Sequence, residues 1–363
     1  MIDEGSATRK FLVGFAKVSA ARWSILFVGV DSVDFSVLVD QFFALTIDGI
    51  ALGFIYSLIA LGYTMVYGVL RLINFANSEV FMLGTFATIM TSKNIFGYVD
   101  ETEPISGIKL VYTLLACMLV SMLVCAITGV LVEIIAYRRL RKMGSNRLTT
   151  LISAIGVSIV ISETVRILTS SAPANNPRLL DKIYLISYMG TEFHIGSVRI
   201  PVSAFEVRLD TLLVIIFAIL LLIGVDRFVK HSRLGKGIRA VSMSEQNSQL
   251  MGVNLNKVIS STFFIAGLMT GAAAFFYTTV YESTKFNVGF ELGLAAFTAA
   301  VLGGIGNIRG AFFGGIALGV LEIYAATIFG TQWKAVTAFV VLVLVLLFKP
   351  NGLFGESLQQ ARV

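Results

Sequence analysis

Apolar residues occur along this chain in nine long runs separated by shorter polar stretches. The runs cover residues 44–67, 72–90, 110–136, 148–168, 212–229, 259–280, 292–305, 311–329 and 335–348. A helix needs roughly 20 apolar residues to cross the hydrocarbon core of a bilayer, which is about 30 Å thick. The alternation of apolar and polar positions typical of a membrane β-barrel does not occur in these runs. The pattern therefore predicts an all-α integral membrane protein, a polytopic bundle of about eight or nine apolar helices.

One polar and basic stretch, residues 226–253, separates two of the apolar runs. Its first half has a basic residue at almost every third position: Arg227, Lys230, Arg233, Lys236 and Arg239. Its second half, residues 240–252, is polar and mostly free of glycine, which favours a short helix along the membrane surface. Because membrane-crossing runs flank the stretch, it must lie in water at a membrane face, where a soluble partner can reach it.

Charge distribution predicts which face this is. The chain is 56% hydrophobic and 14% charged, and its net charge is +6. The basic residues lie beside apolar runs rather than along one surface, which is typical of topology signals and not of nucleic-acid binding. A second basic cluster, residues 138–147, is two runs away from 226–253, so both are expected in the cytoplasm. Residues 93–109 and 169–210 then lie outside, and the end of the chain after Lys349 lies inside.

The two ends of the chain are expected to lie outside the bundle of membrane-crossing helices. Residues 1–41 form an interfacial or disordered extension, because Lys17 and Arg22 interrupt the apolar region that a cleaved signal peptide would need. Residues 355–363 are expected to form a cytoplasmic tail. The central segment, residues 42–354, is predicted to be one membrane domain.

Several kinds of chemistry find little support. The segment Leu234-Gly-Lys-Gly-Ile lacks the glycine spacing and the hydroxyl residue of a phosphate-binding loop. The two histidines, His194 and His231, are both in polar stretches, which argues against a serine-histidine-aspartate or zinc protease site. Cys117 and Cys125 share one apolar run without a histidine or acid nearby, so they are interpreted as core residues. We expect no metal, no cofactor and no catalytic residue in this chain.

Glycines cluster in the segment 303–319. Six of them recur at spacings that place small residues on one helix face, where backbones can approach closely: Gly303, Gly306, Gly310, Gly314, Gly315 and Gly319. A dinucleotide-binding fingerprint is disfavoured because the spacing differs and no strand precedes it. We interpret the glycines as helix-packing positions, with a tight turn at 307–309 dividing the segment into two helices.

Four polar residues interrupt the second apolar run, 72–90. Asn74, Asn77 and Ser78 fall on one side at helical spacing, and Glu79 is adjacent. An acid within a membrane segment is energetically costly and tends to face a cavity or a partner. These residues are candidates for lining a pathway or gate. The alternative is a helix end at the interface whose polar side chains are simply wet.

Other acids in apolar runs are interpreted more simply. Glu163 and Arg166 are three residues apart and can pair on one helix face. Glu291 and Glu322 have no partner in the sequence nearby, so we assign them no role.

Five sequence blocks, in order and with similar spacing, resemble one known family. The blocks are Tyr63-Thr-Met-Val-Tyr-Gly, Ile73-Asn-Phe-Ala-Asn-Ser-Glu, Leu151-Ile-Ser-Ala-Ile-Gly-Val-Ser-Ile, the basic stretch 226–253, and Phe297-Thr-Ala-Ala-Val-Leu-Gly-Gly-Ile-Gly. Together they resemble the LivH-type permease of branched-chain amino-acid ABC importers, from about Phe42 to Phe354. The resemblance implies a bacterial inner-membrane subunit that works with a second permease, two cytoplasmic ATPases that bind ATP, and an extracytoplasmic substrate-binding protein, in contact with membrane lipid.

The resemblance also assigns residues to the coupling with the ATPase. Residues 240–252, within a loop at about 226–256, align with the family's coupling element, and Glu245 and Gly252 match its acid and glycine. The implied coupling residues are Arg239, Ser244, Glu245, Leu250 and Gly252. One departure concerns the segment at 74–79: the family's His-Gly pair is replaced by Asn77 and Ser78, while Glu79 is kept.

This departure leaves the substrate open. A permease for urea or short amides, on the same scaffold, is the alternative within the family. A stand-alone secondary transporter, in which Glu79 or Glu163 carries an ion, is the alternative from another class. An intramembrane enzyme is disfavoured because no nucleophile and base pair is evident.

Overall fold

The computed structural model describes residues 41–98, 108–176, 184–188, 192–195, 198–201 and 205–355. Most of these residues are helical, and six short strands form three two-stranded antiparallel sheets. Apart from Gln41 and Gly355, the extension expected at 1–41 and the tail expected at 355–363 lie outside the described residues.

Among the described residues, nine longer helical segments make up the bundle. Seven are long and apolar enough to cross a membrane: α3 (Phe42–Leu70), α5 continued by η2 and α6 (Ile108–Lys142), α7 (Arg147–Leu168), α8 (Leu209–His231), α11 (Leu255–Tyr281), α13 (Ile308–Phe329), and η3 with α14 (Thr331–Phe348). Within the composite segments, the bounds are α5 (Ile108–Val132), η2 (Glu133–Arg138), α6 (Arg139–Lys142), η3 (Thr331–Trp333) and α14 (Lys334–Phe348). The other two are shorter: α12 (Val288–Gly303), which is apolar, and α4 (Asn77–Met90), which begins with three polar residues. The predicted class, a polytopic helical bundle, is confirmed.

The start of the second predicted run is wrong. α3 ends at Leu70, where Arg71 takes a left-handed conformation with φ of 51°, and α4 begins only at Asn77. The residues between them form a turn in which the Ser78 hydroxyl donates to the carbonyl oxygen of Phe75 over 2.6 Å. Polar side chains that bond the backbone locally compete with helix, so the apolar count alone misplaced this boundary. α4 is continued by the π-helix η1 (Thr91–Ile95).

The glycine-rich segment is divided near the predicted position. α12 ends at Gly303 and α13 begins at Ile308, so the turn lies at 304–307 rather than at 307–309. Asn307 caps the second helix, since its side-chain oxygen accepts from the backbone N–H groups of Arg309 and Gly310 at 3.1 and 3.2 Å.

Five of the six glycines lie where two helix backbones meet: Gly303, Gly310, Gly314, Gly315 and Gly319. A Cβ on Gly315, for example, would lie 2.6 Å from both the Cα and the backbone nitrogen of Ser57 in α3. The expected packing role does not extend to Gly306. It lies in the turn with φ of +99°, and within the described part of the chain a Cβ there would approach only the Tyr67 ring, at 4.0 Å.

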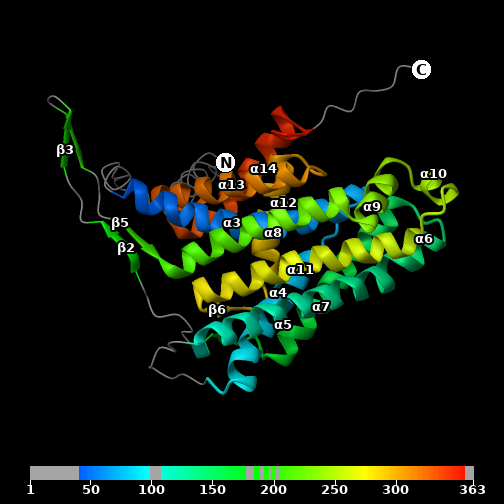
Figure 1. The fold of residues 1–363 in the computed structure, drawn as a ribbon, viewed down its shortest axis with the longest axis horizontal. Helices are drawn as coiled ribbons and strands as arrows, with labels where there is room; N and C mark the ends of the chain where they lie inside the picture. The colour runs from blue at the N-terminus through cyan, green and yellow to red at the C-terminus, as the bar shows by residue number, and fades with distance from the viewer. Residues whose placement is uncertain are drawn as a thin grey trace, which may run out of the picture.

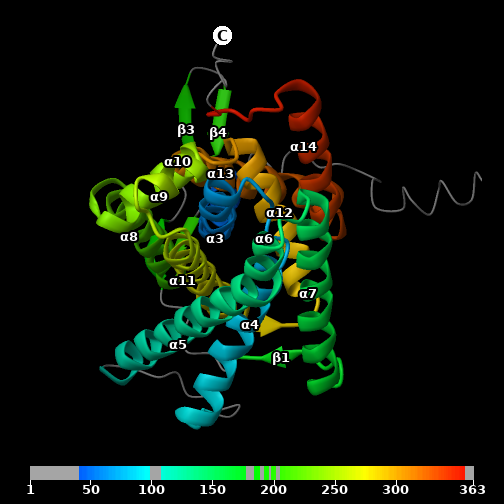
Figure 2. The same cartoon turned by 90° about the vertical axis from the view of Figure 1, so that its right-hand side faces the viewer.

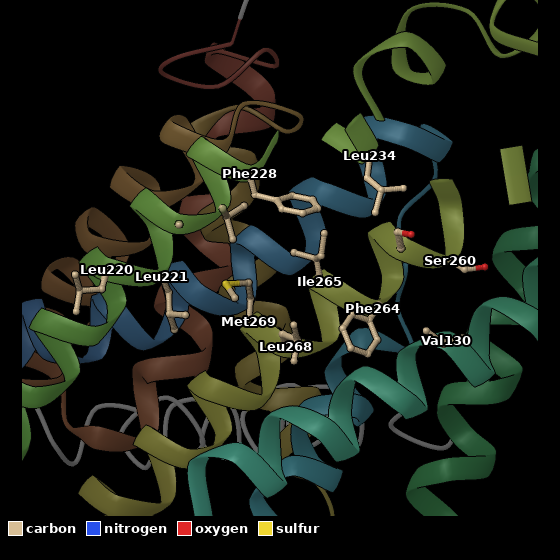
Figure 3. Close-up of a pocket in the computed structure, with 13 residues that line it drawn as sticks. Val130, Leu220, Leu221, Phe228, Leu234, Ser260, Phe264, Ile265, Leu268 and Met269 are labelled. Atoms are coloured by element: carbon tan, nitrogen blue, oxygen red, sulfur yellow. The ribbon is translucent and has the colours of Figure 1, made fainter. Parts of the chain in front are cut away.

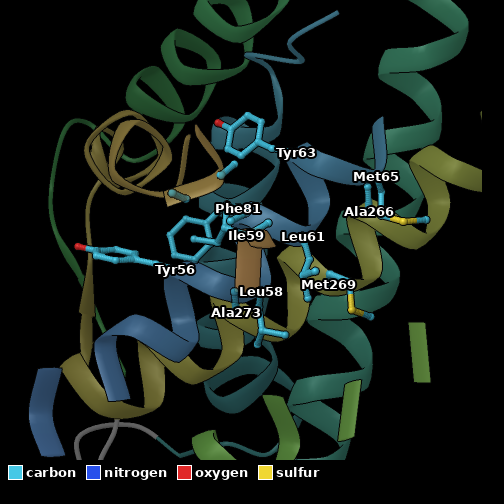
Figure 4. Packing of buried hydrophobic residues seen from close by; sticks show 14 of the residues in the cluster. Tyr56, Leu58, Ile59, Leu61, Tyr63, Met65, Phe81, Ala266, Met269 and Ala273 are labelled. Atoms are coloured by element: carbon cyan, nitrogen blue, oxygen red, sulfur yellow. The ribbon is translucent and has the colours of Figure 1, made fainter. Parts of the chain in front are cut away.

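α3 lies at the centre of the bundle, with α11, α12 and α13 around it (Figure 2). In each helix we compare the most apolar stretch of 18 residues. In this stretch, 56% of the residues are buried in α3 and 72% in α11, but only 11% in α7 and in the segment formed by η3 and α14. α3 is apolar on all sides, as expected of a central helix. Figure 4 shows its Tyr56, Leu58, Ile59 and Leu61 near Phe81 of α4 and Met269 and Ala273 of α11. α7 and α14 therefore leave most of their surface to lipid or to another subunit.

The two ends of the bundle differ in structure (Figure 1). At one end lie α6 and the two short helices α9 (Arg233–Met243) and α10 (Glu245–Leu250). At the other end lie the strands β2 (Tyr184–Tyr188), β3 (Glu192–Ile195), β4 (Val198–Pro201), β5 (Phe205–Arg208) and β6 (Ser283–Thr284), the last paired with β1 (Ala174–Asn175). Both basic clusters thus lie at the same end, as the charge pattern predicts.

Candidate functional site

The basic stretch contains three helical pieces. Asp226 to His231 belong to the end of α8, α9 follows from Arg233, and α10 follows from Glu245. The short helix expected over 240–252 is divided: residues 240–243 belong to α9, and only 245–250 form the separate helix α10. Its start is capped by Ser244, whose hydroxyl oxygen accepts from the backbone N–H of Asn247 over 3.3 Å.

Gly252 ends this helical piece. Its φ is +77°, a left-handed conformation that favours glycine, and its N–H donates to the carbonyl oxygen of Gln249 over 2.9 Å. The next N–H, of Val253, donates to the carbonyl oxygen of Ser248 over 3.0 Å. This geometry is that of a glycine-terminated helix, so a chain reversal follows α10 directly.

Three large apolar side chains project from this region into solvent. Met243 is 83% exposed, and Leu250 and Met251 are each 86% exposed. We call these three residues the apolar tip. Met243 is the last residue of α9, and Leu250 and Met251 lie at the end of α10. Large exposed apolar side chains are typical of a surface that binds another protein. Glu245 is exposed beside them.

Arg239 has a different position from the other implied coupling residues. Its guanidinium Nη2 donates to the carbonyl oxygen of Lys230 at the end of α8, over 3.0 Å. Arg71, in the turn after α3, donates to the carbonyl oxygen of Ser242 over 3.1 Å. The two arginines therefore link α9 to the end of α8 and to the turn after α3.

The four polar residues near the start of α4 are buried. Asn74, Asn77 and Glu79 are each 3% exposed and Ser78 is 6% exposed. The alternative of a wet helix end is thus wrong for this structure. Burial makes each unpaired polar group costly, so the hydrogen-bond partners decide what the cluster can do.

Partners for this cluster come from three other helices. The Tyr137 hydroxyl in η2 donates to Asn74 Oδ1 over 3.0 Å, and the Thr270 hydroxyl in α11 donates to Asn77 Oδ1 over 3.3 Å. The Asn77 side-chain nitrogen is buried and, within the described residues, has no hydrogen-bond partner. The cluster therefore joins α4 to the helices on two sides of it while keeping an unused donor.

Glu79 lies between the beginnings of two short helices. It is in the first turn of α4, and a Cβ on Gly289, in the first turn of α12, would lie 2.8 Å from its Oε2. Its Oε1 accepts a long hydrogen bond, 3.4 Å, from Ser158 of α7, and its Oε2 is buried without a partner among the described residues. Helix beginnings carry partial positive charge, which favours a carboxylate there. The site can hold a polar group deep in the bundle.

Comparison with known proteins identifies the family. A model of the family described as "Branched-chain amino acid transport system / permease component" matches residues 45–347. The chain belongs to this family. The match covers the nine helical segments except for residues 42–44 at the start of α3 and Phe348 at the end of α14.

Individual relatives of this permease agree with the family match. It is 37% identical over 310 residues to the high-affinity branched-chain amino acid transport system permease protein BraD of Pseudomonas aeruginosa, covering 85% of this chain and 94% of that protein. It is 34% identical over 312 residues, with the same coverage, to LivH of Escherichia coli K12, which carries the same description. A weaker likeness, 25% over 184 residues and 49% of this chain, exists to a ribose import permease of Haemophilus influenzae. No solved structure matches.

These likenesses confirm two of the expectations. The resemblance to LivH-type permeases is correct, and the permease is a multi-pass protein of the bacterial inner membrane. The coupling and pathway residues are not tested by the likenesses and remain predictions. Among the described residues, no group of three or more histidine, cysteine or acidic side chains is arranged to hold a metal ion.

An apolar cavity of about 630 Å³ lies against α11, between α5 and α8 (Figure 3). Its walls include Phe228, Leu234, Phe264 and Met269, and its only polar side chains are two serines. Such a lining offers no charged group to a polar solute. The permease can bind apolar material there, but the cavity has no chemistry for an amino acid.

Two acids that sequence reasoning left without a role lie together. Glu322 of α13 and Glu291 of α12 line one cavity with Lys334 of α14. Glu322 accepts a hydrogen bond from the Tyr56 hydroxyl of α3 over 3.0 Å. The residues are far apart in the chain, so no local sequence signal links them.

Structural ion pairs account for two further acids in the membrane. Glu163 pairs with Arg166 over 2.6 Å, as expected, and both are about half exposed. Glu133 is fully buried; its carboxylate pairs with Arg138 over 2.6 Å and accepts from the Ser260 hydroxyl over 3.0 Å. The pair lies within η2, and its hydrogen bonds with Ser260 link η2 to α11.

Proposed function

We propose that this permease forms half of a translocation path for branched-chain amino acids, opened and closed by ATP hydrolysis in separate ATPase subunits. The observation that carries the coupling part is the apolar tip on a capped, glycine-terminated helix beyond the membrane bundle. The substrate is inferred from the names of two relatives, the branched-chain amino acid permeases BraD and LivH, which are 34–37% identical over 85% of this chain.

The mechanism proposed here begins at the ATPase. A groove on that subunit receives α10, with Leu250 and Met251 buried in it and Glu245 facing basic groups at its rim. Ser244 and Gly252 fix where the helix begins and ends. When the ATPase pair closes, α10 moves with it, and the hydrogen bond of Arg239 to the end of α8 carries the displacement into the membrane.

The pathway is proposed to pass the buried cluster of Asn74, Asn77, Ser78 and Glu79. The support is the unused donor of Asn77 and the unpartnered oxygen of Glu79, both buried in the bundle. A passing solute with polar groups forms temporary hydrogen bonds with the Asn77 nitrogen and the Glu79 oxygen. In the resting state, the first turns of α4 and α12 close the gate around these two atoms.

The proposed assembly contains a second permease subunit, two cytoplasmic ATPases, an extracytoplasmic substrate-binding protein and surrounding lipid. Within this chain, residues 42–354 form the permease domain and residues 226–256 its coupling loop. The chain itself is not an enzyme in this proposal, because the ATP is bound by the partner subunits.

The coupling is tested on the assembled importer in liposomes that contain ATP. Glu245→Lys and Leu250→Ser are expected to lower both co-purification of the ATPase and leucine uptake by at least roughly tenfold, since each removes part of a small docking surface. Met143→Ser is the matched control: it is 71% exposed near the other basic cluster and outside the coupling helix. Normal ATP-driven uptake by both coupling variants would remove the docking role.

A second experiment addresses substrate and energy source. We expect the partner binding protein to bind leucine, isoleucine and valine in calorimetry, and uptake to require ATP. Binding of urea or short amides instead would assign the permease to the other branch of the family. Transport by the purified permease alone on an ion gradient would replace the ATP-driven mechanism by that of a secondary transporter.

A further inference from the structure

One small cavity combines charged, aromatic and aliphatic side chains from five helices. Its volume is about 150 Å³, room for roughly five to ten water molecules. The walls are formed by Leu52, Tyr56, Tyr277, Tyr281, Glu291, Leu292, Ala295, Glu322, Lys334, Ala335 and Ala338. We call it the Glu322 cavity. Since charges are costly inside a membrane bundle, several in one cavity point to a ligand.

The Glu322 carboxylate is the deepest charged group of the cavity. The residue is 4% exposed. Its Oε1 accepts from the Tyr56 hydroxyl over 3.0 Å, while its Oε2 is buried without a hydrogen-bond partner among the described residues. A carboxylate with one satisfied and one unsatisfied oxygen needs a further donor, and a positively charged donor suits it best.

The other charged groups lie nearer the surface. Lys334 is partly buried, and Glu291 is exposed, with its Oε1 accepting from Asn287 over 2.7 Å. An occupant whose cation reaches Glu322 therefore has an ammonium group, that of Lys334, available for a carboxylate of its own.

The remaining walls suit an aliphatic group and a cation. Leu52, Leu292 and Ala338 are buried and apolar. The rings of Tyr277 and Tyr281 lie with their centroids 4.7 Å apart, tilted by 33°. Electron-rich ring faces attract an ammonium group when water is excluded.

The cavity lies toward the end of the molecule opposite α10. Tyr281 is the last residue of α11 and is followed by β6, which Figure 1 places at the strand-bearing end. By the proposed topology this end is outside, where a binding protein releases its ligand. The first turn of α12 adjoins both sites: Glu291 lines this cavity, and Gly289 faces Glu79.

We propose that the Glu322 cavity binds an α-amino acid with an aliphatic side chain, as a zwitterion, with its ammonium on Glu322 and its carboxylate toward Lys334. The aliphatic side chain packs on Leu52, Leu292 and Ala338. The inference rests on the proposed function, and it adds a low-affinity recognition site within the permease to the selection made by the binding protein.

The test measures binding without transport. The permease–ATPase complex in lipid nanodiscs, without the binding protein and without ATP, is titrated with tritiated leucine. Saturable binding is expected, displaced by valine and isoleucine. The amine 3-methylbutylamine, which lacks the carboxylate, and 4-methylpentanoate, which lacks the ammonium, are each expected to compete at least about tenfold more weakly, because each forfeits one charged contact.

Two variants identify the groups. Glu322→Gln keeps an acceptor for Tyr56 but not the charge, and is expected to weaken leucine binding by about tenfold or more. Lys334→Met is expected to remove the preference for leucine over 3-methylbutylamine, a change of selectivity that a structural role alone would not produce. Tyr324→Phe is the matched control. Tyr324 is on α13 two residues from Glu322, but its hydroxyl bonds Thr46 and the carbonyl oxygen of Phe42 outside the cavity.

The outcomes separate this inference from the proposed function. ATP-driven leucine uptake by the full importer, together with no saturable binding in the nanodiscs, would overturn the cavity assignment and leave the function standing. Equal binding of leucine and 3-methylbutylamine by the unaltered protein would overturn it too, since the cavity would then be a plain cation site. Loss of leucine uptake in every assembly would instead count against the function.

Discussion

The contact of α3 with α13 gives a prediction whose size can be worked from distances. At Gly315 a Cβ would lie 2.6 Å from the Cα and the backbone nitrogen of Ser57. Carbon atoms in contact rest at about 3.5–4.0 Å, so Gly315→Ala requires the two helices to separate by roughly 1 Å. The nearest atom is the Ser57 side-chain oxygen, but the two backbone atoms behind it cannot turn aside.

The separation has a further cost at the same place. Ser57 donates its hydroxyl to the carbonyl oxygen of Phe312 over 2.6 Å, and this bond from α3 to α13 lengthens when the helices part. Overpacking of this kind costs about 1–3 kcal/mol. Alanine also favours helix over glycine by up to about 1 kcal/mol, which partly hides the packing cost in a single variant.

A matched glycine removes this ambiguity. Gly156 lies within α7, and a Cβ there meets no described atom within 4 Å. Gly156→Ala carries the same helix preference without the clash. The difference in unfolding free energy between Gly315→Ala and Gly156→Ala is therefore expected to be about 1–3 kcal/mol, measured by equilibrium unfolding in mixed detergent micelles. Equal stabilities for the two variants would refute the packing role of this glycine.

Three further predictions concern ion pairs and the coupling helix. Glu133→Gln is expected to destabilise the fold by more than about 1 kcal/mol, because it breaks the ion pair between the buried Glu133 and Arg138. Glu163→Gln, at a half-exposed pair, is expected to cost about 0–1 kcal/mol. Thermal unfolding compares the two variants, and equal midpoints would contradict the difference in burial. Gly252→Ala is expected to destabilise the end of α10 by about 1–2 kcal/mol, because the φ of +77° at this position is unfavourable for alanine. Hydrogen exchange of the amides at the end of α10 should become faster, and unchanged exchange would contradict the prediction. Ser244→Ala removes the cap at the start of α10 and is expected to destabilise this helix by about 1 kcal/mol. Hydrogen exchange of the Asn247 amide should become faster, and an unchanged rate would show that the cap does not stabilise the helix.

The bundle was largely predictable because its signals are local. Nine apolar runs gave nine helical segments, and the charge clusters predicted that residues 138–147 and 226–253 share one end. The serine and glycine flanking α10 are likewise short-range capping signals, readable from a few neighbouring residues.

Boundaries and long-range contacts were predicted less well. The run 72–90 was predicted to begin too early because hydropathy does not register that Ser78 bonds back to Phe75. Arg71, which ends α3, lies between the two predicted runs. The cavity that Glu322 and Lys334 both line is formed by five helices from distant parts of the chain. A single sequence holds no signal for such a contact, so an acid without a local partner was read as having no role.

The contact of α3 with α13 also bears on how the permease can move. Helices that slide past each other do so by letting side chains change rotamer at the interface. Where Gly315 and Gly319 face Ser57 and Gly53, there is almost no side chain to rearrange. We therefore expect α3 and α13 to travel through the transport cycle as one rigid unit, with the bending and sliding confined to the thinly covered helices around them.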